Sequence, residues 1–306
     1  QQLITYLEDN KLLSGQQFGY RKQRSTELAV NFLLDNLRKE VDKGKMVGVV
    51  FVDLSKAFDT ISHNALLSKL PSFGIVEKEL KWFETYLFHR QQHVCYENTN
   101  SDVSFVERGV PQGSILGPLL FMLFYNDLVY KLHDVKIIKF ADDTALYYAS
   151  ESFNNIENVV NNALNNLYDY FYENELVINL KPGKTEAMLF GTSKRLKQNP
   201  EKLHLKYNGK DINFTTNYKY LGTILDPTLN LKDNFRKTYK KVSSRLKMLY
   251  NIKEILSSKV RKKIYTTMIL PLLTYHCTVD LTFTEWKLAK IKSVDNRAFQ
   301  IINEDL

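Results

Sequence analysis

The sequence has little cysteine and no long apolar run. Its two cysteines, Cys95 and Cys277, lie far apart and form no metal-ligand pattern, which excludes a zinc knuckle. We expect both to be buried free thiols of a reducing compartment. No stretch approaches the roughly 18 apolar residues of a transmembrane helix, so we expect no membrane span. The chain opens with Gln1 and has no secretory signal, so we interpret it as a fragment.

The remaining composition is that of a globular protein with an uneven charge distribution. The 306 residues are 44% hydrophobic and 25% charged, enough for a core in two domains. Residues 1–230 carry 26 Lys and Arg against 27 Asp and Glu, whereas residues 231–306 carry 16 against seven. This local basic excess indicates a polyanionic partner. The alternative is a solvated, lysine-rich helical surface.

Hydrophobic periodicity predicts an α+β fold for residues 1–227, with helices packed on an antiparallel sheet. We expect strands at 46–54, 93–96, 103–107, 137–141, 144–149, 186–190, 203–207, 211–214 and 218–225. We expect helices at 3–13, 26–42, 64–70, 77–89, 114–132 and 152–174. Residues 228–306 are predicted to be basic and wholly helical, with helices at 232–252, 258–276 and 284–303. We place the boundary at Pro227, because proline disfavours helix at the residue before it.

The first candidate site residue is Asp53, which ends the apolar run that begins at Met46. A carboxylate at the end of a buried strand is costly unless it is paired or binds a cation. Phe58 stands five residues further on, where a turn could return its ring to a sugar pocket. The alternative is that Asp53 caps a helix and Phe58 lies in the core.

The second candidate is the pair Asp142 and Asp143 between two apolar runs. Neighbouring residues of a straight strand point to opposite faces, so both carboxylates reach one site only through a sharp turn. We expect that turn at the tip of a hairpin, with Asp142 as the direct metal ligand and Asp143 beside it. The alternative is a solvated Asp-Asp turn.

Two loops offer further candidates. The loop 108–118 contains Gln112, whose amide can contact a nucleotide, and Gly113, which allows close backbone approach before a helix N-terminus. The alternative is a loop that caps a core helix. The loop 179–185 contains Lys184, which could reach a leaving pyrophosphate. The alternative is an ordinary surface lysine.

The order of these segments carries a family resemblance. The segments resemble motifs A to E of a reverse transcriptase palm in their order along the chain. They are a strand ending in Asp53, the Gln112-Gly113 loop, the Asp142-Asp143 hairpin, Lys184 before a strand, and Tyr220-Leu-Gly-Thr223. The sequence resembles reverse transcriptases of non-LTR retrotransposons, especially the jockey-like group, over residues 15–303. The segment 17–21 also resembles that family upstream of motif A.

The resemblance implies a right-hand polymerase: partial fingers and palm in residues 1–227 and a helical thumb in 228–306. It implies an RNA-directed DNA polymerase that adds dNTPs to a primer 3′-hydroxyl with two Mg²⁺ ions, or Mn²⁺. By analogy, the roles are metal ligands (Asp53, Asp142 and Asp143), motif D lysine (Lys184), sugar gate (Phe58), nucleotide contacts (Gln112 and Gly113), primer grip (Tyr220, Leu221 and Gly222) and thumb contacts to duplex backbone (Lys240 and Lys241).

The implied partners are an RNA template, a DNA primer and dNTPs, and the implied location is intracellular and nuclear during integration. We find no segment equivalent to the upstream fingers with their triphosphate-binding arginine, no endonuclease and no RNase H pattern. An alternative is therefore a nucleic-acid-binding remnant without catalysis. A third possibility, an RNA-dependent RNA polymerase or intron maturase, is disfavoured by Phe58 as a gate against ribonucleotides.

Overall fold

The structure, a computed structural model, describes residues 2–199, 202–280 and 284–303. The chain forms two compact units. One comprises the chain up to Ala29 and Glu40–Thr215, and the other comprises Val30–Lys39 and the chain from Thr216 onward. Helix α2 (Thr26–Asp42) has the predicted bounds and begins after the N-cap Ser25. It contributes residues to both units. Among the described residues, no helix combines the length and the apolar character needed to cross a membrane.

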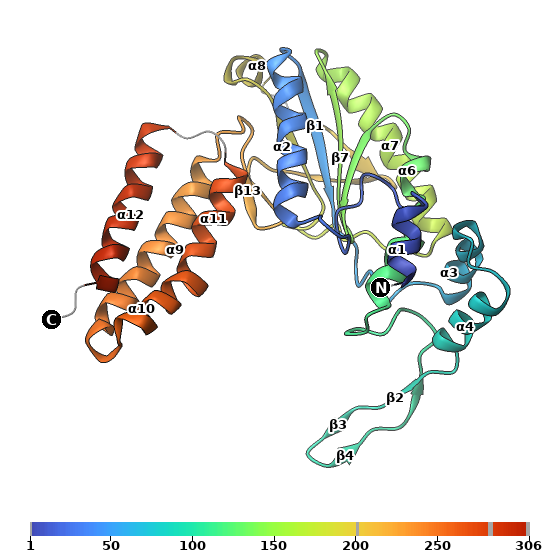
Figure 1. Cartoon of the computed structure of the whole chain (residues 1–306). Coiled ribbons are helices and arrows are strands. Elements are labelled where there is room, and N and C mark those ends of the chain that lie inside the picture. Colours follow the sequence, from blue (N-terminus) through green and yellow to red (C-terminus); the bar gives the residue numbers. More distant parts are fainter. Residues whose placement is uncertain (1, 200–201, 281–283, 304–306) are drawn as a thin grey trace. The chain divides into compact units, whose positions relative to one another are not determined.

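A five-stranded sheet lies at the centre of the first unit (Figure 1). Its order is β11 (Asn213–Phe214), β8 (Glu186–Phe190), β1 (Met46–Val52), β7 (Asp143–Ser150) and β6 (Lys136–Phe140). Neighbouring strands are antiparallel except β11 and β8, which are parallel. The expectation of a purely antiparallel sheet is wrong at this edge. The short hairpin of β9 (Lys206–Tyr207) and β10 (Lys210–Asp211) turns the chain before it joins β8.

Strand β1 is the central strand, and all seven of its residues are buried. This confirms the prediction of a strand covered on both faces. A strand in that position has no solvent-facing side, so its residues form a continuous apolar run. Helix α7 (Phe153–Glu173), capped by Ser152, packs against β1 and β7. A Cβ at Gly48 would lie 2.4 Å from Cγ2 of Ile156, so glycine permits this close helix–sheet contact.

The predicted helix 114–132 is wrong as a single element. The structure has α5 (Gly117–Phe124) and α6 (Leu128–Lys131), with Tyr125 and Asn126 near the break. The carbonyls of these two residues accept hydrogen bonds from the buried Nζ of Lys139, at 2.7 and 3.4 Å. The Asn126 side chain also accepts a hydrogen bond from the Ser14 backbone N–H at 2.8 Å. These tertiary contacts compete with continuation of the helix.

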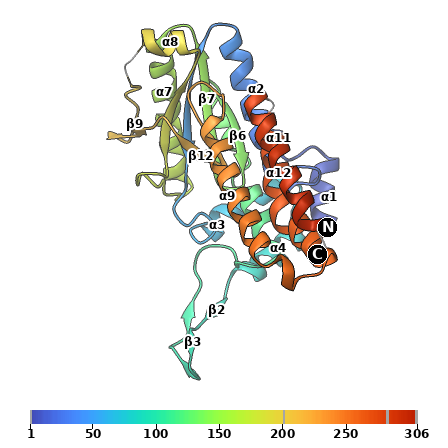
Figure 2. The same ribbon diagram turned by 90° about the vertical axis from the view of Figure 1, so that its left-hand side faces the viewer.

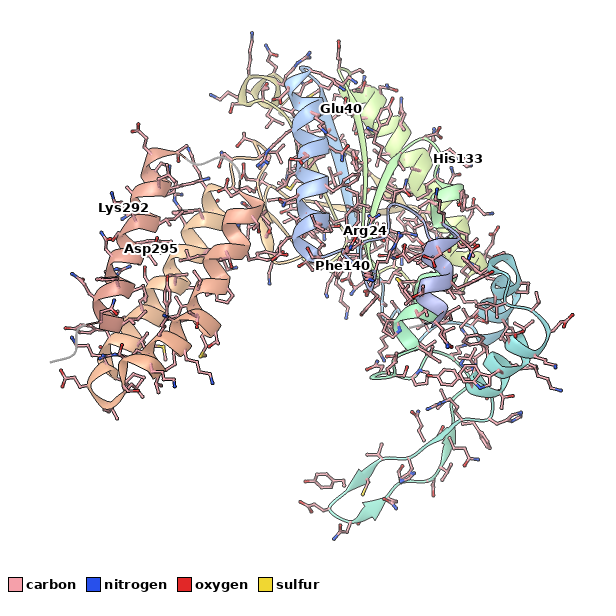
Figure 3. All side chains as sticks on the ribbon, viewed as in Figure 1. Arg24, Glu40, His133, Phe140, Lys292 and Asp295 are labelled. Carbon is pink, nitrogen blue, oxygen red and sulfur yellow. The ribbon has the colours of Figure 1, made fainter. Side chains whose placement is uncertain are left out.

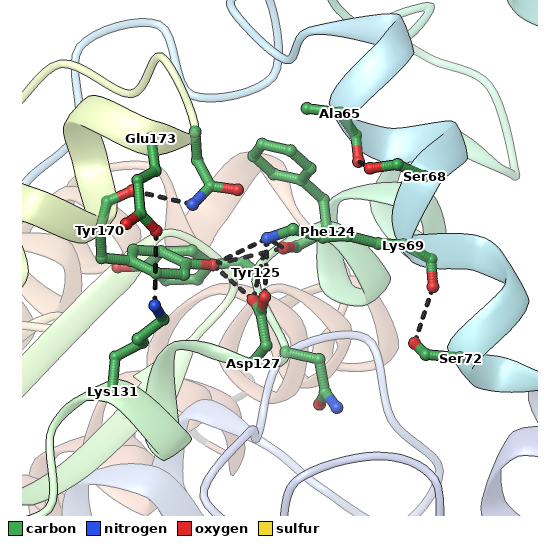
Figure 4. A network of polar contacts seen from close by, with 12 residues as sticks. Ala65, Ser68, Lys69, Ser72, Phe124, Tyr125, Asp127, Lys131, Tyr170 and Glu173 are labelled. Atoms are coloured by element: carbon green, nitrogen blue, oxygen red, sulfur yellow. Dashed lines mark hydrogen bonds and ion pairs between the residues drawn. The ribbon is translucent and has the colours of Figure 1, made fainter.

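A polar network joins the same break to two other helices (Figure 4). Lys69, at the end of α3 (His63–Lys69), donates to the carbonyl of Phe124 at 2.9 Å and forms an ion pair with Asp127 at 2.9 Å. The hydroxyl of Tyr170 on α7 donates to the same Asp127 carboxylate at 2.6 Å. The network fixes α3 and α7 against the α5–α6 junction.

The turn from α2 into β1 is also held by charge. Glu40 lies in the last turn of α2 (Figure 3). Its carboxylate is 3.0 Å from Nζ of Lys43 and 2.8 Å from Nζ of Lys45. Hydrogen bonds from Lys45 and then Lys43 lower the pKa of Glu40 to about 2. The ion pairs therefore favour one path from the end of α2 into the central strand.

The other elements of the first unit are short. They are α1 (Gln2–Asp9), the 3₁₀ turn η1 (Leu70–Phe73), α4 (Glu77–Leu87) and α8 (Ser193–Gln198). After α4 the chain forms an extended arm (Figure 1), in which β2 (Gln91–Gln92) pairs with β5 (Ser104–Phe105), and β3 (Cys95–Tyr96) with β4 (Thr99–Asn100). Cys95 is exposed on this arm, so the expectation of a buried thiol is wrong there. The side chain of Cys277 lies outside the described part.

The second unit is a helical bundle preceded by a hairpin. Its elements are β12 (Tyr218–Tyr220), β13 (Thr223–Leu225), α9 (Lys232–Asn251), η2 (Lys253–Ile255), α10 (Ser258–Ile264), the π-helical η3 (Tyr265–Ile269), α11 (Leu270–Val279) and α12 (Glu285–Asn303). Helices α9, α11 and α12 lie side by side (Figure 2). Their facing residues form a separate core that includes Leu246, Leu273 and Val294.

Two predictions for this unit are wrong in detail. Residues 218–225 form a hairpin and not one strand, because Leu221 and Gly222 both have positive φ, at 43° and 89°. The predicted helix 258–276 is divided by the π segment, which precedes Pro271; proline has no N–H to continue a regular α-helical ladder. The second compact unit resumes at Thr216, and the domain boundary at Pro227 stays a prediction. The backbone N–H of Ile224 donates to the Asn234 side chain at 3.0 Å and so ties the hairpin to α9.

Candidate active site

Asp53 follows the last residue of β1, at one end of the central strand. Its Oδ2 accepts a hydrogen bond from Nδ2 of Asn179 at 3.0 Å, and its Oδ1 lies 3.4 Å from Nζ of Lys184. The backbone is fixed as well, since the Asn179 N–H donates to the Asp53 carbonyl at 2.8 Å and the Asp53 N–H donates to Oγ1 of Thr185 at 3.1 Å. No helix starts here, so the alternative of a helix-capping Asp53 is not what the structure shows.

The β6–β7 hairpin brings Asp142 and Asp143 to the same end of the sheet. Phe140 pairs with Asp143, so Ala141 and Asp142 form a two-residue turn and Asp143 is the first residue of β7. The hairpin is as predicted, but its turn lies one residue earlier than the expected tip of Asp142 and Asp143. Val52 pairs with Thr144 across β1 and β7, which places Asp53 beside Asp143 in the continuing register. The carboxylate of Asp53 therefore meets those of Asp142 and Asp143 at one sheet end, although Asp53 lies far from the other two in sequence.

The electrostatics of the three carboxylates reflect this convergence. Partial burial raises the pKa of Asp142, and the charge of Asp53 raises it further. Partial burial, followed by the charges of Asp142 and Asp53, raises the pKa of Asp143 to about 6, although the residue is exposed at the surface. The positive charge of Lys184 opposes both shifts. A cation at this position would relieve the mutual repulsion.

The donor set suits a hard divalent cation, but it is not a ready-made cage. Within the part of the chain that the structure describes, no group of three or more His, Cys, Asp or Glu side chains is arranged to hold a metal ion. Mg²⁺ keeps several waters and uses only one or two carboxylates together with substrate phosphates. The carboxylate oxygens of Asp53, Asp142 and Asp143 meet that lesser requirement.

Phe58 lies in the irregular segment after Asp53. Its ring is partly buried and packs against Phe121, with ring centroids 4.7 Å apart, and it meets the Tyr20 ring edge-on at 6.5 Å. Phe58 therefore makes the contacts expected of a core residue, which was the alternative interpretation, while part of its ring remains accessible. Burial raises the pKa of the Tyr20 hydroxyl, and the negative charge of Asp142 raises it further. Tyr20 therefore lies close enough to Asp142 to sense its charge.

The loop with Gln112 and Gly113 is tied to this segment. The N–H of Val110 donates to the Phe58 carbonyl at 2.8 Å, and Nε2 of Gln112 donates to the Asp59 carboxylate at 2.6 Å. Gln112 and Gly113 are exposed, and Gly113 has a φ of 75° with open space where a side chain would project. Helix α5 begins at Gly117, three residues later than predicted.

Lys184 is not an isolated surface lysine, since its ammonium group pairs with Asp53 while half of its side chain stays accessible. The remaining candidates belong to the second unit. Tyr220 is buried, Leu221 and Gly222 form the β12–β13 turn, and the hydroxyl of Tyr275 donates to the Leu221 carbonyl. Lys240 and Lys241 are exposed on α9.

Three contributors were missed by sequence reasoning. Asn179 and Thr185 bracket the loop in which only Lys184 was assigned a role, yet both bind Asp53 directly. Gln17 lies in the quoted segment 17–21, and its buried side chain contacts the turn at Ala141. One signal for them was present in the sequence, namely that they are polar residues in loops near the predicted strands. That signal does not identify which distant residue each of them contacts.

Comparisons with known proteins identify the family of the chain. Residues 1–225 match the family described as reverse transcriptase (RNA-dependent DNA polymerase). The probable RNA-directed DNA polymerase from transposon BS of Drosophila melanogaster is 28% identical over 97% of this chain and 33% of its own length. The RNA-directed DNA polymerase from mobile element jockey of Drosophila funebris is 27% identical over 98% of this chain and 33% of its own length. The chain thus spans about a third of these relatives.

Among solved structures, apo telomerase from Candida tropicalis is similar in fold, with a TM-score of 0.53 and 13% identity over 98% of this chain and 54% of that one. A form of the same telomerase truncated from its C-terminal domain gives a TM-score of 0.51 and 12% identity, over 76% of this chain and 43% of that one. At this identity the likeness concerns the fold alone.

Proposed function

The chain belongs to the reverse transcriptase (RNA-dependent DNA polymerase) family, and on this premise we propose that it is the RNA-directed DNA polymerase core of a jockey-like non-LTR retrotransposon. The observation that carries the proposal is the meeting of Asp53, Asp142, Asp143 and Lys184 at one end of the sheet. The implied reaction joins a dNTP to the 3′-hydroxyl of a DNA primer on an RNA template.

The first unit would be the palm with partial fingers, and the helical second unit would be the thumb. The sheet of the first unit supports this assignment, because it carries the carboxylates at a rigid strand end and at a short hairpin turn. In this proposal, the missing endonuclease and the remaining fingers belong to other parts of a longer element. A nuclear site of action during integration follows from the same proposal.

Asp53, Asp142 and Asp143 would hold two Mg²⁺ ions, with Mn²⁺ as a substitute. When bound, such ions lower the pKa of an attacking hydroxyl and neutralise charge on a leaving pyrophosphate. The chain supplies the rest. The Lys184 ammonium group lies 3.4 Å from an Asp53 oxygen, and in this proposal it would transfer its interaction from that carboxylate to a phosphate that arrives beside it.

Phe58 would act by exclusion. Its ring is fixed by Phe121 on one side, so a ribose 2′-hydroxyl that projects toward it would meet a surface that cannot move away. Gln112 and Gly113 are exposed on the loop that is hydrogen-bonded to Phe58 and Asp59, where they could contact the incoming nucleotide and the template. The hairpin of Tyr220, Leu221 and Gly222 would grip the primer, and Lys240 and Lys241 would contact duplex phosphates.

A second candidate function is a nucleic-acid-binding remnant without catalysis. It is favoured by the basic excess of residues 231–306, which could bind a polyanion without any metal at the carboxylates. Incorporation of dTTP on a poly(rA)/oligo(dT) duplex in the presence and absence of Mg²⁺ separates the two candidates. Mg²⁺-dependent extension supports the polymerase. Binding of the duplex by the folded protein without any extension supports the remnant.

A further inference from the structure

A short segment near the N-terminus runs along the outer strand of the sheet. The N–H of Lys139 on β6 donates to the Gln16 carbonyl at 2.8 Å, and the N–H of Phe18 donates to the Lys139 carbonyl at 2.8 Å. Gln17 thereby forms a parallel bridge with Lys139. This pairing brings the Gln17 side chain next to the turn that carries Asp142.

The Gln17 amide uses both of its ends on that turn. Its Oε1 accepts from the N–H of Ala141 at 3.0 Å and from the N–H of Gly19 at 2.8 Å, and its Nε2 donates to the Ala141 carbonyl at 3.5 Å. The residue is 1% exposed. Water cannot replace these partners, so loss of the amide leaves the Ala141 N–H buried without an acceptor.

Ala141 needs such support because its backbone is left-handed, with a φ of 57°. This conformation is disfavoured for a residue with a Cβ. The segment also approaches the turn very closely, since a Cβ at Gly19 would lie 2.5 Å from the Ala141 nitrogen. Ala141 directly precedes Asp142, so its conformation sets the direction in which that carboxylate leaves the turn.

We propose that Gln17 is a positioning residue, which holds Ala141 in the left-handed conformation and thereby aims the Asp142 carboxylate. The inference rests on the proposed polymerase function, and it assigns Gln17 no contact with substrate. A relaxed turn would displace the Asp142 carboxylate. A displacement of about 1 Å at a reacting centre can reduce the rate about a hundredfold.

The test compares Gln17→Met, which keeps the side-chain length but removes the hydrogen bonds, with the matched control Gln16→Ala. The Gln16 side chain is exposed, with Ser14 Oγ as its hydrogen-bond donor. In steady-state extension of poly(rA)/oligo(dT), we expect Gln17→Met to lower kcat about a hundredfold while KM for dTTP changes by less than about threefold. Gln16→Ala should match the wild type. An unchanged kcat in folded Gln17→Met overturns the proposal.

Amide hydrogen exchange of Ala141, measured by NMR without metal or substrate, gives an independent readout. The wild-type amide should be protected, and Gln17→Met should release it while the amides of β1 stay protected. A wild-type Ala141 amide that exchanges as fast as an exposed one overturns the proposal even if the variant fails to fold. A wild type that shows this protection but extends no primer contradicts the proposed polymerase and leaves the Gln17 contact in place.

Discussion

Lys139 is a buried lysine near the end of β6, the strand that leads to the proposed catalytic turn. It is 0% exposed, and its ammonium group is hydrogen-bonded to the carbonyls of Tyr125 and Asn126 and lies 5.2 Å from the centre of the Tyr125 ring. Burial lowers the pKa of Lys139 to about 7. These contacts reduce the cost of burying the charge without removing it.

This residue gives the folding stability a specific pH dependence. Between about pH 7 and its ordinary pKa of 10.5, Lys139 is protonated in the unfolded chain and largely neutral in the folded one. The unfolded state then binds more protons, so the free energy of unfolding rises with pH, by up to about 1.4 kcal/mol per unit. Urea unfolding between pH 7 and pH 10 should show this rise for the wild type and lose it in Lys139→Met. Exposed Lys136 on the same strand supplies the control Lys136→Met. Parallel curves for the wild type and Lys139→Met would contradict the prediction.

Phe58 makes a second prediction at the residue scale. Replacing it with valine removes the ring that Phe121 supports and opens space for a 2′-hydroxyl. We expect the ratio of kcat/KM for UTP to that for dTTP to rise by about tenfold or more in Phe58→Val. Phe105→Val, on the exposed arm, serves as the control. An unchanged ratio would show that Phe58 is only a core residue.

At the scale of elements, the sequence pattern predicted those helices and strands whose formation depends on residues within the same segment. The apolar run of β1, the helical period of α7 and the start of α2 at Thr26 are each encoded within one segment, and all were predicted. The break at Tyr125 and Asn126 was not, because its partners Lys139 and Ser14 lie elsewhere in the sequence. The Leu221-Gly222 turn was missed because an apolar leucine at positive φ gives no turn signal.

Helix α9 carries the charge prediction made from the sequence. Lys240 and Lys241 are exposed on it, and each phosphate contact releases counterions when it forms. Changing both to glutamine should weaken binding of an RNA–DNA duplex and make the slope of log affinity against log salt shallower by about 2. Fluorescence anisotropy between 50 and about 200 mM salt measures both quantities. A matched change of exposed Lys194 and Lys197 on α8 should leave the slope unaltered. The same loss in both pairs would indicate a general charge effect.

At the scale of the molecule, the candidate site was named from the order of its segments. Asp53, Asp142, Asp143 and Lys184 lie within or beside apolar strands, and that pattern alone left other interpretations open. The resemblance to reverse transcriptase motifs selected them, and their chemical roles stay predictions. Their meeting depends on the order β8–β1–β7–β6, which brings the carboxylates of β1 and of the hairpin to one end. The supporting residues Gln17 and Asn179 could not be named, since hydrogen bonds across 124 and 126 residues leave no periodic trace.

The central claim is that this sheet end is a polymerase active site, and primer extension with Asp142→Ala tests it most directly. The wild type, Asp142→Ala and the control Asp134→Ala, whose carboxylate is exposed before β6, are compared on poly(rA)/oligo(dT) with dTTP and Mg²⁺. The account predicts extension by the wild type and Asp134→Ala and none above background by Asp142→Ala, with duplex binding retained in all three. Extension by Asp142→Ala at the wild-type rate would contradict it.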